Sequence, residues 1–269
     1  MVEILLICFL AWLLLGCLAG LVAGLLGVGG GVVIVPVLVF LFQAQGFGDV
    51  HIMHLALGTS LATIAVTSIA SVVTHHRLGS LNWRLVLWLT PGLIAGAAIG
   101  ALCADKVASG TLQRLFGLFE MAVALYMFCG SRVTGVKQAQ ISALELMVSG
   151  TVIGAISAML GIGGGTMTVP YLSWRGRVIR EAVAISAACG FPIALAGGVG
   201  YLLAGLDAQG LPPLTTGYLY WPALVVISST SLLLAPVGAR LAHRLPVGRL
   251  KRLFAMILMV IGAVMLISI

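Results

Sequence analysis

Two glycine-rich segments hold the residues of this chain best suited to bind a ligand. Residues 27–36 read GVGGGVVIVP, and residues 161–170 read GIGGGTMTVP. Consecutive glycines permit positive φ angles and leave backbone N–H groups uncovered by side chains. A helix that restarts after them presents its first N–H groups and the positive end of its dipole to the break. Each segment therefore predicts an anion site made without a cationic side chain.

A glycine and a proline bound each predicted helix break. Gly27 and Pro36 bound the first break, and Gly161 and Pro170 bound the second. We place each proline in the first turns of the restarted helix, where its missing N–H matters least. Lipid makes unpaired backbone groups costly, so a broken helix repeated in two halves of a membrane protein points to a transport site.

Composition places the chain in the membrane. Hydrophobic residues make up 61% of its 269 residues and charged residues only 8%, against roughly 25% charge in soluble domains. The net charge of +7 lies in short gaps between apolar runs, which indicates topology signals and not nucleic-acid binding. The five cysteines fall in apolar segments without metal-ligand spacing. We therefore expect no metal, no cofactor and no nucleic-acid partner, and a lipid bilayer around the chain.

The glycine motif is part of a longer duplication. GSLNW at 79–83 matches GYLYW at 217–221, and GTLQRLF at 110–116 matches GRLKRLF at 248–254. These blocks predict an all-α polytopic membrane protein with two repeats, residues 1–136 and 137–269. Each repeat would hold about four transmembrane helices and a short re-entrant or broken helix at the GxGGGxxxxP motif.

The distribution of Lys and Arg favours inverted repeats. If the chain turns back at each glycine motif, all of the 14 Lys and Arg residues except Lys106 and Arg114 share one side of the membrane. If the motif is only a kink, the separation is poorer. The first arrangement obeys the positive-inside rule better. An odd number of passes per repeat then inverts the two halves, a common transporter plan, and places both termini on the side opposite the basic residues.

The paired motifs resemble the TauE/SafE family of sulfite and organosulfonate exporters. The glycine motifs, Gly58-Thr59-Ser60-Leu61, and the Gly-x-Leu-x-Trp patterns at 79–83 and 217–221 carry the resemblance. It implies a multi-pass carrier of the bacterial cell inner membrane, with both termini in the periplasm and small sulfur anions as substrates. One departure is that Ile185-Ser186-Ala187-Ala188 stands where the first repeat has the Gly-Thr-Ser-Leu segment. In this alignment Ser186 mirrors Thr59.

A sulfite or sulfonate head accepts hydrogen bonds through three oxygens, which backbone N–H groups and hydroxyl groups can donate. The predicted substrate-binding residues are Gly29, Gly30, Gly31, Thr59, Ser60, Gly163, Gly164, Gly165, Thr166 and Ser186.

Glu120 is the carboxyl group predicted at greatest depth, near the centre of 112–130. An ionisable group at that depth is a functional candidate. It could couple transport to protons, or it could be a protonated side chain that bonds a neighbouring helix. We expect His75 and His76 at headgroup level, and Glu145 at the membrane interface.

The leading hypothesis is a secondary transporter of a small anion, most simply sulfite or a short organosulfonate, which works by alternating access. The alternatives are an anion channel, or a carrier for a carboxylate or another sulfur compound. A membrane-embedded enzyme is the weakest interpretation, because no nucleophile, metal cluster or carboxylate pair is predicted at depth, and we do not expect an enzyme. The sequence leaves open whether the protein forms a homodimer.

Overall fold

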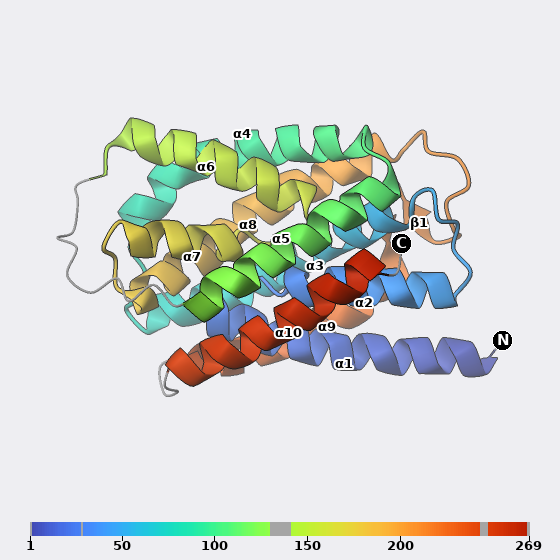
Figure 1. Ribbon diagram of the computed structural model, residues 1–269, viewed down its shortest axis with the longest axis horizontal. Coiled ribbons are helices and arrows are strands. Elements are labelled where there is room, and N and C mark those ends of the chain that lie inside the picture. The colour runs from blue at the N-terminus through green and yellow to red at the C-terminus, as the bar shows by residue number, and fades with distance from the viewer. Residues whose placement is uncertain (1, 28, 130–140, 243–246, 268–269) are drawn as a thin grey trace.

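The computed structural model describes residues 2–27, 29–129, 141–242 and 247–267. The described part of the chain is almost entirely helical (Figure 1). Its elements are α1 (Val2–Leu26), α2 (Gly31–Ala44), α3 (Ile52–Arg77), α4 (Trp83–Asp105), α5 (Ser109–Cys129), α6 (Ala143–Met159), α7 (Gly165–Trp174), α8 (Ile179–Ala204), β1 (Thr215–Thr216), β2 (Leu219–Tyr220), α9 (Trp221–Ala242) and α10 (Val247–Ile267).

Helix length separates spanning helices from half-helices. Among the described residues, α1, α3, α4, α8 and α9 contain stretches apolar and long enough to cross a membrane. In contrast, α2 has 14 residues and α7 has 10, which is fewer than the roughly 20 that a spanning helix needs. These two short helices are the ones that follow the glycine motifs. The predicted class, an all-α polytopic membrane protein with a short broken helix at each motif, is confirmed.

The main helix contacts join the two halves of the chain. Helix α1 packs on α9, α4 on α6, α3 on α8, and α5 on α10, so each pair takes one helix from 1–136 and one from 137–269. Figure 1 shows α4 beside α6 and α5 beside α10. Glycines let these helices approach closely: a Cβ at Gly96 of α4 would overlap the carbonyl oxygen of Thr151 in α6. Such small-residue contacts are typical of helices packed in membranes.

The chain turns back on itself at the first glycine motif. At the start of α2, a Cβ at Gly30 would lie 2.8 Å from the carbonyl oxygen of Ala19 in α1. At the other end of α2, Phe42 and Trp12 of α1 contact the same ring, Tyr220, with centroid distances of 5.4 and 5.9 Å. Helix α2 therefore runs antiparallel to α1, and the two form a re-entrant helical hairpin.

The second motif makes the same turn. Glu145, in the first turn of α6, forms an ion pair with Arg175, which caps the end of α7. It also accepts a hydrogen bond from the Tyr171 hydroxyl of α7, at 3.1 Å. The start of α6 thus meets the end of α7, and these helices form a second re-entrant hairpin.

One short element was not predicted. The sequence places residue 217 at the start of an apolar run, but residues 215–220 form a two-stranded hairpin and α9 begins only at Trp221. Gly217, with φ 54°, forms the turn, and a Cβ there would overlap the carbonyl oxygen of Leu202. Figure 1 shows this hairpin, the start of α1 and the end of α10 toward the same end of the molecule.

Candidate functional site

The two helix breaks have the same backbone conformation. Gly30 precedes α2 with φ 80° and ψ −11°, and Gly164 precedes α7 with φ 76° and ψ −15°. Both lie in the left-handed region, which favours glycine. Neither helix start has a side-chain cap. The N–H groups of Val33 and Met167 already donate to the carbonyl oxygens of Gly30 and Gly164, at 3.0 and 3.2 Å. By helix geometry the N–H groups of the first two residues of α2 and α7 have no intrahelical partner, so these are the ones that can serve a ligand.

The two breaks touch each other. A Cβ at Gly29 would lie 3.0 Å from the Cα of Gly163, and a Cβ at Gly31 would overlap the carbonyl oxygen of Gly161. Both approaches are between backbones, which only glycine permits at this spacing. The structure therefore brings the predicted glycines of 29–31 and 161–163 together, with one break from each half of the chain.

Each break is held to the opposite half of the chain by the hydroxyl group of one serine. Ser60 of α3 donates to the carbonyl oxygen of Gly161 at 2.9 Å, and Ser186 of α8 donates to that of Gly27 at 2.7 Å. Both serines are fully buried. Their hydroxyl hydrogens are used on these carbonyl groups, so in this conformation the serines position the breaks and do not donate to a ligand.

This pairing corrects the alignment of α3 with α8. The counterpart of Ser186 is Ser60, where the sequence alignment paired it with Thr59. A second contact has the same register, because Gly27 packs on Val183 while Gly161 packs on Leu57. The match of α3 to α8 given by these contacts therefore differs by one residue from the best match of their sequences. The Thr59 hydroxyl instead accepts a hydrogen bond from the Tyr220 N–H at 3.0 Å.

The second break carries hydroxyl groups that the sequence only partly predicted. Thr166 was predicted, but Ser157 of α6 and Thr168 of α7 were not. All three are buried, and their hydroxyl groups have no hydrogen-bond partner among the described residues. The only signal for Thr168 was its place two residues after Thr166 in the motif. Ser157 had none, because a lone serine in an apolar helix is ordinary.

Both prolines lie in the first two turns of their helices, as predicted, but past the positions where a missing N–H has no cost. Pro36 is inside α2 and Pro170 is inside α7, in the second helical turn in each case. The missing N–H comes after the first four N–H groups of the helix, which never have a helical acceptor, so it would normally have donated within the helix. It leaves the carbonyl groups of Val32 and Thr166 without their helical donors, so each proline frees a backbone acceptor next to a break.

Glu120 lies apart from the breaks in the described contacts. It is 1% exposed, and neither carboxyl oxygen has a partner among the described residues. Its neighbour is α10, where a Cβ at Gly262 would lie 3.2 Å from the Glu120 Cβ. The structure therefore shows a buried carboxyl group where α5 meets α10, without a hydrogen bond to any described residue of a neighbouring helix.

The histidines at the end of α3 differ from each other. Both are predicted at headgroup level. His75 is buried within the protein, with Nε2 3.3 Å from the carbonyl oxygen of Gly24. His76 is exposed, and its Nδ1 accepts a hydrogen bond from the Trp83 indole at 3.1 Å.

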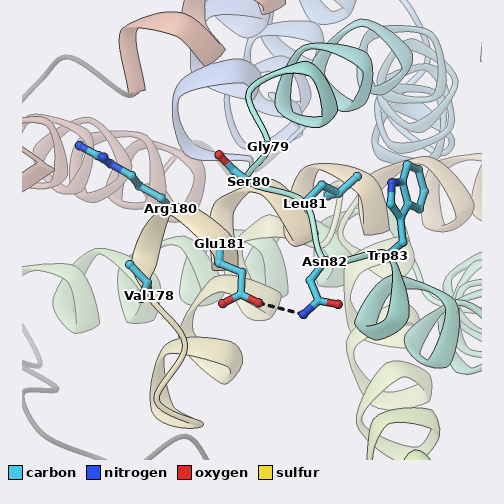
Figure 2. Close-up of a pocket in the computed structure, with 8 residues that line it drawn as sticks. All are labelled: Gly79, Ser80, Leu81, Asn82, Trp83, Val178, Arg180 and Glu181. Atoms are coloured by element: carbon cyan, nitrogen blue, oxygen red, sulfur yellow. Dashed lines mark hydrogen bonds between the residues drawn. The ribbon is translucent and has the colours of Figure 1, made fainter.

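An open pocket of about 520 Å³ lies where the α3–α4 connection meets the start of α8 (Figure 2). Asn82 donates to Glu181 across it at 3.1 Å, and Arg180 also lines it. No lining residue belongs to a glycine motif. The pocket is therefore a polar hollow at one end of the helices, distinct from the contact between the breaks.

Helices that span a membrane around two opposed helix breaks define the class of membrane transporters. Comparison with known sequences agrees with this class. The chain matches the family described as Sulfite exporter TauE/SafE over residues 12–265, and it belongs to that family.

Several relatives match most of the chain. A probable membrane transporter protein of Haemophilus influenzae is 36% identical over 250 residues, which cover 93% of this chain and 95% of the relative. A probable membrane transporter protein of Methanocaldococcus jannaschii is 27% identical, with 94% of each chain covered. The relative YdhB of Bacillus subtilis is 28% identical over 85% of this chain and 88% of its own. No solved structure matches the chain.

Proposed function

We propose that the protein is a secondary transporter of a small anion, sulfite or a short organosulfonate, bound where the two helix breaks meet. The observation that carries this proposal is the contact of the breaks: Gly29 on Gly163, and Gly31 on Gly161. The starts of α2 and α7, which have no side-chain caps, would then face one region. Both would favour negative charge there through their N–H groups and dipoles.

The donor set suits transport because it is neutral. Backbone N–H and hydroxyl groups can bind the oxygens of an anion, and a donor set without a cationic side chain would hold the anion weakly enough to release it. Cytoplasmic and periplasmic access would alternate as the helices of one half move against the other. The Ser60 and Ser186 bonds join each break to the opposite half, so they would move with the breaks.

The orientation follows from the basic residues and the turns at the breaks. Arg77, Arg84 and Arg240 stand at the end of α3, the start of α4 and the last turn of α9, whereas Lys106 caps the end of α4. The positive-inside rule assigns the first group to the cytoplasm. The halves 1–136 and 137–269 would then be inverted repeats in the inner membrane, with both termini periplasmic. Glu120 is our candidate for carrying a coupled proton.

Flux through purified protein in liposomes tests the proposal. We expect saturable uptake of labelled sulfite, accelerated by sulfite on the opposite side. Gly30→Leu and Gly164→Leu should abolish this flux while the protein still reaches the membrane. A side chain at Gly30 would meet the carbonyl group of Ala19, one at Gly164 would meet Ile193, and each would strain a left-handed residue next to the contact. Gly110→Leu is the control, since Gly110 is an exposed residue of α5 with nothing within 4 Å of a Cβ.

Each alternative has its own result in this assay. Flux that does not saturate and shows no counter-transport would indicate an anion channel. Saturable flux of a carboxylate or another sulfur compound, without sulfite or sulfonate, would change the substrate class. Chemical conversion of the solute would indicate an enzyme. Wild-type flux in both break variants would remove the breaks from the mechanism.

A further inference from the structure

We propose that three hydroxyl groups at the second break, those of Ser157, Thr166 and Thr168, hold the oxygens of the anion, and that the first break supplies only backbone donors. We call these groups the second-break hydroxyls. The ligand they fit is an anion with three oxygens on one atom. This inference rests on the proposed function, because it names the side chains and the ligand head at the same site.

Two of the second-break hydroxyls, those of Ser157 and Thr168, lie near Gly164, the residue that precedes α7. The position that a Cβ would take at Gly164 lies 3.7 Å from the Thr168 Oγ1 and 3.8 Å from the Ser157 Oγ. Ser157 comes from α6 and Thr168 from α7, so the hydroxyl groups approach from both arms of the hairpin. Thr166 is the second residue of α7, at the helix end that offers free N–H groups.

Their burial is the second observation that points to a ligand. Ser157 is 2% exposed, Thr166 is 7% exposed and Thr168 is fully buried. None of the three hydroxyl oxygens has a hydrogen-bond partner in the described chain. A buried hydroxyl without a partner is unfavourable, and buried polar groups in proteins are nearly always paired. Three such groups beside one helix start are explained by a ligand that accepts their hydrogen bonds.

The first break has the same backbone conformation as the second but lacks the hydroxyl groups. In the alignment of the two motifs, Ala23, Val32 and Ile34 stand where the second break has Ser157, Thr166 and Thr168. The backbone at Gly30 nevertheless has the conformation of Gly164. Hydroxyl groups are therefore not required to form a break, and their presence at only one break indicates a function other than folding.

The number and kind of donors favour one ligand head. Three hydroxyl groups and the N–H groups of α7 are donors without charge, and a sulfite or sulfonate head offers three oxygens on one atom. A carboxylate offers only two oxygens, both in one plane, so two of the hydroxyl groups would have to share one oxygen. The charged residues of this hairpin, Glu145 and Arg175, pair with each other at its far end and leave the break neutral.

Binding of methanesulfonate and acetate to the purified full-length protein tests the proposal. These probes carry the same charge and the same methyl group, and differ in the number of oxygens. We expect wild type to bind methanesulfonate at least tenfold more tightly than acetate. Ser157→Ala, Thr166→Val and Thr168→Val should each weaken methanesulfonate binding about tenfold, because each removes a hydrogen bond to a charged group.

Ser228→Ala is the matched control. Ser228 of α9 is also buried and its hydroxyl group also has no partner in the described chain, but it lies outside both motifs. We expect the Ser228→Ala variant to bind methanesulfonate as tightly as wild type does. The three variants without ligand should be as heat-stable as wild type, or more so, because they lose an unpaired buried group. Only the stabilisation by methanesulfonate should fall.

Wild-type affinity in the three variants, or an equal loss in Ser228→Ala, would overturn the assignment and leave the hydroxyl groups to bound water. If the wild-type protein bound methanesulfonate and acetate with equal affinity, the preference for a three-oxygen head would be overturned. A wild-type protein that neither binds nor transports any small anion would refute the proposed function itself, which separates that failure from failure of this site.

Discussion

The two helix breaks share a backbone and differ in their side chains. Gly30 and Gly164 adopt the same left-handed conformation, and Ser60 and Ser186 make equivalent bonds to the opposite break. The first break is lined by aliphatic residues, whereas the second carries three buried hydroxyl groups. Folding therefore accounts for the features that occur twice, and the features that occur once are the ones to examine for ligand chemistry.

Helices α3 and α8 show the reverse difference. On α3, Thr63, Thr67 and Ser71 are buried at every fourth position, and Thr67 lies 2.5 Å from the Ser231 hydroxyl of α9. With Ser60 matched to Ser186, the counterparts on α8 are Cys189, Ile193 and Gly197. Polar groups thus lie at the break in the second half, and along the long helix in the first half. In each half, one of these two elements carries buried polar groups and the other is apolar: the long helix is polar in the first half, and the break is polar in the second.

Filling the contact between the breaks should have the largest effect on stability. Gly31→Ala places a Cβ against the carbonyl oxygen of Gly161, and backbone cannot move aside as a side chain can. We expect a loss of about 3 kcal/mol in unfolding free energy, at the upper end of overpacking effects, measured by thermal unfolding in detergent. Gly110→Ala, which meets open space, should lose nothing. Equal stability of the two variants would show that the breaks do not touch.

The serine bonds test the shared part of the comparison. Ser60→Ala and Ser186→Ala each leave a buried carbonyl group without this donor, so we expect each to lower the unfolding free energy by roughly 1–3 kcal/mol. The two losses should be similar, because the bonds are similar in length and burial. Ser80→Ala, at an exposed turn, is the control. A loss in only one of the serine variants would contradict the equivalence of the breaks.

The smallest effect is expected at the open ends of the two hairpins. The second hairpin is closed by the partly exposed pair of Glu145 and Arg175, and such pairs contribute about 0–1 kcal/mol. Glu145→Gln should therefore lower the melting temperature slightly at low salt and not at high salt, because salt screens the pair. The first hairpin is closed by aromatic contacts of Tyr220. If salt acts on Glu145→Gln and wild type alike, the ion pair does not close the hairpin.

The sequence predicted the features that depend on backbone chemistry. Three glycines in a row within an apolar run have few uses other than a break, so the two motifs located both breaks. The basic residues also predicted that the chain turns back at each motif, as the hairpin contacts of Glu145 and Phe42 show. These signals are strong because lipid leaves few alternatives for exposed backbone and for charge.

Features that depend on packing could not be predicted from one sequence. The register that matches Ser186 with Ser60 differs by one residue from the alignment, and only the contacts reveal it. Ser157 and His75 gave no signal, because their burial depends on which face of α6 and α3 meets a neighbour. The hairpin at 215–220 depends on the close fit of Gly217 on Leu202, which joins residues from two different elements.

The central claim is that one anion site, where the breaks meet, opens to each side of the membrane in turn. A single cysteine tests it most directly: Val32→Cys, in the first turn of α2, with the five native cysteines replaced by alanine. The variant leaves the second-break hydroxyls intact. We predict that a membrane-impermeant thiol reagent labels it from either side in oriented vesicles, and that sulfite slows labelling from both. Labelling from one side only, or no effect of sulfite on it, would contradict the account.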